Sequence, residues 1–202
     1  ELVTTLMGIG SLVAVWAEAP DALEETLEAM AVTSDRAAEL AVAAPVDCLM
    51  IPENLSSEVV GRRFYREYMR PWESHWLARI HAAGKASFIH MDGTLRGLIA
   101  QVAATGFGVI EAVTPLPVGD VAMGDLRAIA GSDAILWGGL PGTYFTPLVS
   151  DAEFERHTRE MLEVMVRDRR MVLGVADQVP PDGLPSRVEW VVELVEQYGR
   201  YH

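Results

Sequence analysis

The sequence predicts an α/β protein in which helices cover a parallel sheet. Short apolar segments rich in β-branched residues alternate with amphipathic segments along all 202 residues. Apolar strands that are each followed by a helix are typical of parallel sheets. Half of the residues are hydrophobic, which allows a sizeable core. No change in composition marks a boundary, so we expect residues 1–202 to form a single domain.

Six strands are expected, and each is a short apolar run that ends at a turn or at polar residues. The first covers Leu2 to Met7 and is followed by a turn at 8–11. The strand that begins near Ala86 is rich in aromatic and β-branched side chains. The expected strands lie near Leu2, Cys48, Ala86, Val109, Ala134 and Val172.

Helices are expected between these strands, since apolar residues recur there every three or four positions. Asp21 and Glu24 have the spacing of a capping box at the start of one helix. We expect Cys48 to be buried and His157 to be exposed. Valines 188, 191, 192 and 195 of the last helix are expected to be buried. The expected helices cover 12–18, 20–44 with a break before 35, 61–83 with a break at Pro71, 95–104, 125–130, 151–168 and 185–198.

Charge and cysteine content exclude several classes of function. The formal net charge is −13, whereas a nucleic-acid surface needs clustered Lys and Arg, so no nucleic-acid partner is expected. No apolar stretch reaches the roughly 20 residues of a membrane span, and no membrane partner is expected. The single cysteine, Cys48, excludes an internal disulfide and a multi-cysteine zinc site. These features predict a cytoplasmic protein.

The stretch Phe88–Gly93 is the first candidate site. It ends a strand with His90 and Asp92, and residues two apart on a strand point to the same side. In parallel α/β proteins, ligands bind at the carboxyl ends of the strands. The alternative is structural, with Asp92 capping the next helix and His90 bonded to backbone. The residues alone leave both readings open.

Other acidic residues follow or end the expected strands, and they extend this site. Glu53, Glu111 and Asp177 hold such positions, and they could converge with His90 and Asp92 at one edge of the sheet. One imidazole with several carboxylates suits a divalent ion such as Zn, Mn or Fe. The same side chains could instead be general acids and bases, or helix caps. Capping fits Asp177 poorly, because prolines 180 and 181 follow it and no helix begins there.

The order of these motifs resembles the uroporphyrinogen decarboxylase superfamily, which includes the tetrapyrrole decarboxylase and the zinc- and cobalamin-dependent methyltransferases. The resemblance covers nearly the whole chain. It depends on the segments Phe64–Trp72, Ile89–Gly93, Leu136–Gly139 and Val172–Asp182. It implies a (β/α)₈ TIM barrel, of which this chain resembles the third to eighth units. We therefore expect preceding residues, or a homo-oligomer, to cover the two open edges of the sheet.

The resemblance also implies roles for individual residues. In the methyltransferases, a His-x-Cys motif and a later Cys bind zinc; His90 matches, Asp92 replaces the first thiolate and Asp177 falls where the second would be. The resemblance thus implies His90, Asp92 and Asp177 as ligands; Glu53, at its strand-end position, completes the expected metal set, with Zn as the expected ion. The expected catalytic set is Asp92, Asn54 and Glu111, of which Glu111 is included for its position inside a strand. Asn54 stands where the decarboxylases have a serine, and Asp177 where they have a histidine.

Three functions are compatible with this resemblance. The favoured one is metal-assisted methyl transfer to or from a small-molecule substrate, with a corrinoid as methyl donor or acceptor and a corrinoid protein as partner. The second is decarboxylation of a carboxylated tetrapyrrole, in which carboxylates stabilise a protonated pyrrole without a metal. The third is a barrel without catalytic activity that binds a corrinoid or a partner protein. The metal content of the protein and the effect of replacing His90 distinguish these functions.

Overall fold

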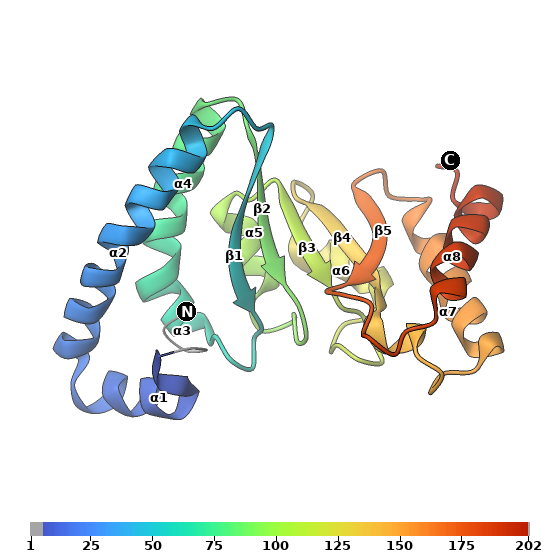
Figure 1. Cartoon of the computed structure of the whole chain (residues 1–202), viewed down its shortest axis with the longest axis horizontal. Helices are drawn as coiled ribbons and strands as arrows, with labels where there is room; N and C mark the ends of the chain where they lie inside the picture. The colour runs from blue at the N-terminus through green and yellow to red at the C-terminus, as the bar shows by residue number, and fades with distance from the viewer. Residues whose placement is uncertain (1–5, 202) are drawn as a thin grey trace. The chain divides into compact units, whose positions relative to one another are not determined.

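The computed structural model describes residues 6–201 (Figure 1). Contacts within the chain divide it into two compact units, residues 1–46 and 47–202. The first unit holds two helices and the second holds the sheet. The two units are described separately below.

The first unit consists of α1 (Gly8–Glu18) and α2 (Pro20–Ala43). The turn predicted at 8–11 is wrong, because these residues form the first turn of α1. A glycine costs a helix only about 1 kcal/mol, and the flanking residues favour helix. The break predicted before Asp35 is also wrong, because α2 is continuous. Residues 2–5 of the first predicted strand lie outside the described residues, and its last two residues, Leu6 and Met7, are helical rather than extended.

The second unit contains a parallel sheet, which confirms the predicted fold class. Its strands follow one another in space in the same order as in the sequence, and every neighbouring pair is parallel. Figure 1 shows the strands side by side from β1 to β5. The strands are β1 (Cys48–Leu55), β2 (Ala86–Met91), β3 (Val109–Val113), β4 (Ile135–Pro141) and β5 (Met171–Ala176).

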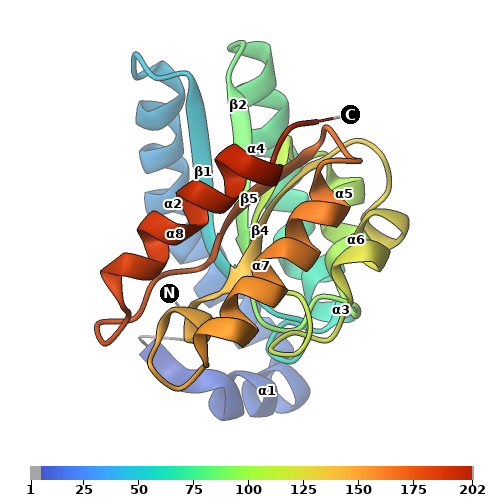
Figure 2. The same cartoon turned by 90° about the vertical axis from the view of Figure 1, so that its right-hand side faces the viewer.

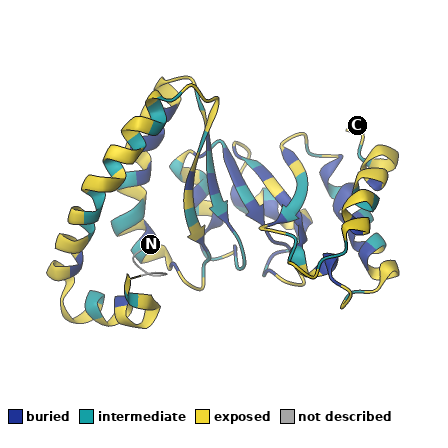
Figure 3. Ribbon diagram, in the orientation of Figure 1, coloured by how far each residue is buried: buried dark blue, intermediate teal, exposed yellow. Residues whose placement is uncertain are grey.

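The helices between the strands pack on one face of the sheet, and α8 follows the last strand. A row of buried residues in mutual register runs across this helix-covered face, made of Ile51, Ile89, Ile110, Leu136 and Met171. Buried residues gather on the strands and on the inward sides of the helices (Figure 3). The helical elements are α3 (Arg62–Phe64), the π-helix η2 (Tyr65–Met69), α4 (Arg70–Ala82), α5 (Ile99–Thr105), α6 (Met123–Ala130), the 3₁₀ helix η3 (Gly142–Phe145), α7 (Asp151–Met165) and α8 (Pro185–Tyr198).

Proline positions explain where several helices begin. Pro71 lies in the first turn of α4, directly after the π-helix, where its missing N–H costs no hydrogen bond. Pro185 begins α8, whose bounds match the prediction. Pro20 begins α2 in the same way. The sequence therefore located the starts of α2 and α8 from a local steric rule. The interruption predicted at Pro71 is wrong, because the chain stays helical from α3 through η2 into α4.

Burial differs from the prediction at the two ends of the sheet and in α7. Cys48, on β1, is exposed rather than buried. Val188, Val192 and Val195 of α8 are also exposed, because α8 lies beyond β5 at the end of the sheet (Figure 2). His157 is buried rather than exposed. It stacks on the ring of Tyr144 at a centroid distance of 4.3 Å and faces the Gly139 carbonyl.

Candidate functional site at the strand ends

His90 and Glu111 form the centre of the candidate site. They are paired in register on β2 and β3, on the face of the sheet opposite the helices, which we call the inner face. His90 Nδ1 lies 2.7 Å from Glu111 Oε2, and both side chains are largely buried. An ionised carboxylate can only accept, so Nδ1 carries a proton and its N–H donates a hydrogen bond to Glu111. In the neutral imidazole, this arrangement leaves the lone pair on Nε2 of His90.

Asp177 lies on the Nε2 side of the same imidazole. Its Oδ1 is 3.8 Å from His90 Nε2, and its side chain is 46% exposed. Asp177 directly follows β5, which is three strands away from β2. In a flat sheet, Cα atoms three strands apart are separated by about 14 Å, which two such side chains cannot bridge. The sheet must therefore curve around its inner face, as in a barrel wall.

Two residues without a glycine's freedom adopt left-handed backbone conformations in or beside this site. Asp177 has φ 70° and Ala112, which follows Glu111, has φ 66°. The register between β3 and β4 shifts at Ala112, between Ile110 and Val113. Non-glycine residues in this conformation cluster at functional sites, where the surrounding structure holds them in place. Here they lie at or beside the two carboxylates that contact the His90 ring, Glu111 at Nδ1 and Asp177 at Nε2.

Asp92 follows β2 and is half-buried. Its backbone N–H donates to Leu55 O at 3.1 Å, which ties the ends of β1 and β2 together. Its carboxylate accepts no hydrogen bond from the residues that the structure describes. The predicted capping role is not seen, because Leu98 is the N-cap residue of α5 and no side chain caps that helix. Asp120 Oδ1 accepts from the N–H groups of Leu95 and Arg96 at 2.7 and 3.2 Å, in the turn before α5. Sequence reasoning missed Asp120, because this contact joins segments that are 24 to 25 residues apart.

Glu53 does not join His90 in the structure. It lies within β1, between Ile51 and Leu55, which are buried in the helix-covered core. Burial raises the pKa of the Glu53 carboxyl, and its charge acts on Glu73 of α4. Asn54 is the exposed neighbour of Glu53. The structure thus brings together His90, Glu111 and Asp177, places Asp92 at the end of the same strand as His90, and separates Glu53 from them.

The side chains of His90, Asp92 and Asp177 are of the types that bind a divalent metal, but their positions in the structure do not form a complete site. One imidazole and two carboxylates are ordinary ligands for Zn, Mn or Fe. Among residues 6–201, however, no three His, Cys, Asp or Glu side chains are close enough together to hold an ion. His90 and Asp177 already face each other. A third donor requires a rotation of the Asp92 side chain, which no described hydrogen bond restrains.

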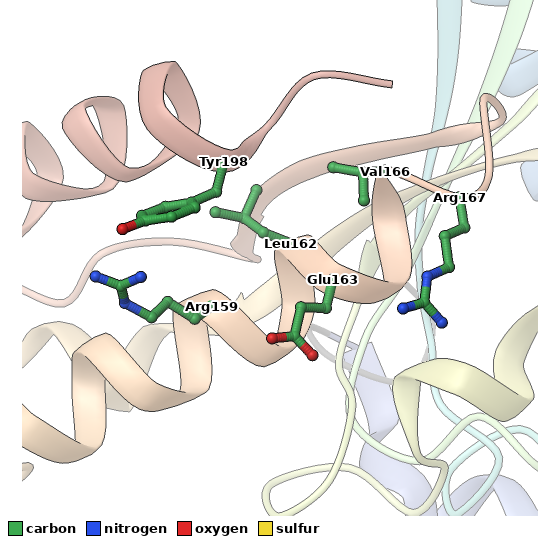
Figure 4. A pocket seen from close by; sticks show the side chains of 6 residues that line it. All are labelled: Arg159, Leu162, Glu163, Val166, Arg167 and Tyr198. Carbon is green, nitrogen blue, oxygen red and sulfur yellow. The ribbon is translucent and has the colours of Figure 1, made fainter. Parts of the chain in front are cut away.

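Cavities elsewhere in the second unit do not reach these residues. One of about 290 Å³ lies between α7 and α8. Figure 4 shows Tyr198 of α8 lying over Arg159 of α7, whose guanidinium carbon is 4.2 Å from the ring centroid. Arg159 also pairs with Glu155 on its own helix. Both partners of this arginine are therefore part of the helix packing, and the cavity is a shallow gap beside it.

Within the described residues, no helix is both long enough and apolar enough to cross a membrane. This agrees with the expectation from the sequence that no apolar stretch spans a bilayer.

Comparison with known structures establishes the fold. A methyltransferase from Methanosarcina mazei superposes with a TM-score of 0.75 at 16% identity, covering 98% of this chain and 56% of that protein. The chain thus spans little more than half the length of that methyltransferase. The citrate synthase SbnG matches with a TM-score of 0.45 at 15% identity, covering 81% of this chain and 69% of SbnG, which is too low to establish a shared fold. No curated protein matches the chain by sequence.

A family model that matches nearly the whole chain identifies the family. The five parallel strands, their order and the likeness to the methyltransferase make the second unit part of a (β/α) barrel, as predicted. The family model described as uroporphyrinogen decarboxylase (URO-D) matches residues 1–198, which confirms the resemblance seen in the motifs. The chain belongs to the uroporphyrinogen decarboxylase family.

Proposed function

We propose that this chain is part of a barrel enzyme that transfers a methyl group of a small-molecule substrate with the help of a divalent metal, with Zn as the expected ion. The observation that carries the proposal is the orientation of His90. Its Nδ1–H is held by Glu111, and its Nε2 lone pair faces Asp177. Metal-binding histidines are typically oriented by a carboxylate on the other ring nitrogen in this way.

His90, Asp92 and Asp177 are the proposed ligands. Two carboxylates and a neutral imidazole together carry the charge that balances a divalent ion. Carboxylates are harder ligands than the thiolates of the methyltransferase branch, which shifts the preference toward harder ions. Glu53 is outside this proposed set, because its carboxyl group lies near enough to Glu73 for its charge to raise the pKa of that residue.

The chain's own residues prepare this site. Glu111 accepts a hydrogen bond from Nδ1–H of His90 and so favours the tautomer that leaves Nε2 free to coordinate. The left-handed backbone at Asp177 turns its carboxylate toward the imidazole. When bound by this set, a divalent ion would supply Lewis acidity for the transfer reaction. A corrinoid as methyl donor or acceptor, and a corrinoid protein that delivers it, complete the proposal.

Metal analysis of the full-length protein, purified without chelator, tests the proposal. We expect about one ion per chain in the wild type and a loss of most of it in His90→Ala. His75→Ala is the matched control, because His75 is an exposed histidine of α4 and its loss should leave the metal in place.

An equal metal content in His90→Ala and His75→Ala would contradict the proposal. The His90–Glu111 pair would then be better explained as an acid–base pair, since an imidazole bonded to a carboxylate is suited to proton transfer. That result would favour decarboxylation of a carboxylated tetrapyrrole, the second function that the family resemblance implies.

A further inference from the structure

Glu73 of α4 is a buried carboxyl group that the proposed function does not use. The residue is only 1% exposed. The hydroxyl of Tyr65 donates to Glu73 Oε2 at 2.6 Å. The other carboxyl oxygen, Oε1, is buried and has no hydrogen-bond partner among the described residues. No arginine, lysine or histidine in the described part of the chain forms an ion pair with this carboxyl group.

The group belongs to a chain of hydroxyls that links two helices and the π-helix. Tyr65, in η2, lies 2.8 Å from the Thr105 hydroxyl at the end of α5. The Thr105 hydroxyl has one proton, which it can donate either to Tyr65 or to Gln101 O, 2.9 Å away. Tyr65 itself is fully buried. The Glu73 carboxyl is therefore enclosed by α4, η2 and α5, and water cannot reach it without a separation of these elements.

We propose that Glu73 is a buried proton-binding switch: a proton held on its carboxyl group keeps α4 packed against the sheet, and release of that proton to solvent loosens α4. A buried carboxylate without a cationic partner is costly, because its solvation by water is lost. The neutral acid avoids this cost, and its second oxygen can carry the proton. The charged form must instead recruit water to Oε1, which requires α4 to move.

The surroundings of Glu73 also favour its protonated form on balance. Burial raises the pKa of Glu73 to about 7, the hydrogen bond from Tyr65 opposes this rise, and the charge of Glu53 on β1 adds to it. Burial likewise raises the pKa of Tyr65, so its hydroxyl stays protonated and acts as the donor. Arg70, at the start of α4, acts on Tyr65 as the nearby positive charge. The protonation of Glu73 thus depends on its burial, on the Tyr65 hydroxyl and on the Glu53 carboxyl group.

The pH range follows from these pKa values. The carboxyl group has an ordinary pKa of 4.5 in the unfolded chain and about 7 in the folded one. The folded protein therefore holds a proton that the unfolded chain has released between these values. The stabilisation is fully present below about pH 4.5 and declines as the pH rises to about 7. One proton raises the unfolding equilibrium constant by at most about tenfold per pH unit.

Denaturant unfolding of the full-length protein between pH 4.5 and 8 tests the switch. Because other carboxyls and histidines titrate in this range, the wild type is compared with Glu73→Gln, which keeps the acceptor for Tyr65 and removes the titration. We expect the ratio of the two unfolding constants to change with pH up to about pH 7 and then to level off. Glu163→Gln, which replaces an exposed glutamate of α7, is the control and should follow the wild type.

Two further variants keep the test decisive if Glu73→Gln does not fold. Tyr65→Phe removes the donor that favours the charged form, so the pH-dependent range should move to higher pH. Glu53→Gln removes the nearby negative charge, so the range should move to lower pH. Hydrogen exchange of the α4 amides, corrected for its intrinsic pH dependence, should speed up across the same range. A flat ratio of unfolding constants, or a range that neither variant moves, would overturn the proposal.

Discussion

Asp177 shows how a single residue can carry both strain and function. Its φ of 70° is a left-handed conformation that Asn and Gly adopt more readily than most residues. Its carboxylate faces His90 Nε2 from a strand that is distant in the sheet. The conformation and the charge can be separated experimentally, because Asn tolerates the same backbone but cannot act as an anionic ligand.

Replacing Asp177 by Asn should therefore leave the fold intact and remove the proposed metal. We expect the free energy of unfolding to change by no more than about 0.5 kcal/mol, since Asn adopts the left-handed conformation with little strain. The metal content of the full-length protein should fall with the loss of the anionic ligand. Asp177→Val is the contrasting variant, because a β-branched residue should add strain and lower stability as well. Retention of the metal in Asp177→Asn would remove this residue from the ligand set.

At the scale of elements, α8 is held to the barrel wall by a buried arginine. Arg187 is 3% exposed and donates to the carbonyl oxygens of Tyr144, Thr146 and Val149 at 2.6 to 2.7 Å. It also bonds Asp151 Oδ1 at 2.8 Å, and its guanidinium lies 5.0 Å from the Phe154 ring centroid. One side chain thus connects α8, η3, the segment after η3 and the start of α7. Val188, Val192 and Val195 of α8 contribute less, because they are exposed.

Arg187→Met should destabilise the protein strongly. The carbonyl oxygens would be left buried without donors, and removing one partner of such a buried network costs about 3–5 kcal/mol. Asp151→Asn should cost less than about 1 kcal/mol, because that carboxylate is largely exposed and the carbonyl bonds of Arg187 remain. Denaturant unfolding of both variants measures the difference. Equal losses would mean that the ion pair, rather than the carbonyl bonds, holds α8.

At the scale of the whole molecule, the inner face of the sheet is the unusual surface. Parallel sheets are normally covered on both faces. Here helices cover one face, while Met50, Trp137 and Val172 on the strands are 48%, 37% and 38% exposed. β1 and β5 each pair with one neighbour only among the described strands. Exposed apolar side chains and open strand edges both favour association.

We therefore expect a polypeptide of these 202 residues alone to self-associate. Val172→Lys places a charge on this face and should shift the protein toward the monomer, because a buried lysine without a partner is unfavourable. Val32→Lys, on an exposed position of α2, is the control and should not change the state of association. Light scattering after size-exclusion chromatography reports the mass. A monomer at all concentrations would show that this surface is stable in water.

The structure confirms much of what the local pattern predicted. Strand β5, helix α8 and the helix starts at Pro20 and Pro185 follow from apolar periodicity and proline sterics, which act over a few residues. The family also follows from the sequence, because its motifs and their order are linear features. The prediction of a turn at the start of α1 was wrong. Gly10 and Ser11 indicate a turn locally, but the flanking apolar residues form a helix.

Long-range packing decided the rest, because it depends on residues that are distant in the chain. The pairing of His90 with Glu111 depends on the register of β2 and β3, and the approach of Asp177 depends on the curvature of the sheet. His157 has the helical spacing of the buried residues Phe154 and Met161, so the period of α7 alone would have placed it on the buried face. Only its contacts with Tyr144 and Gly139 depend on tertiary packing. Glu53 and Glu73 share an environment only because α4 packs behind the sheet. The sequence by itself determined which elements form and which family they belong to, whereas tertiary packing decided which side chains meet and which protons they hold.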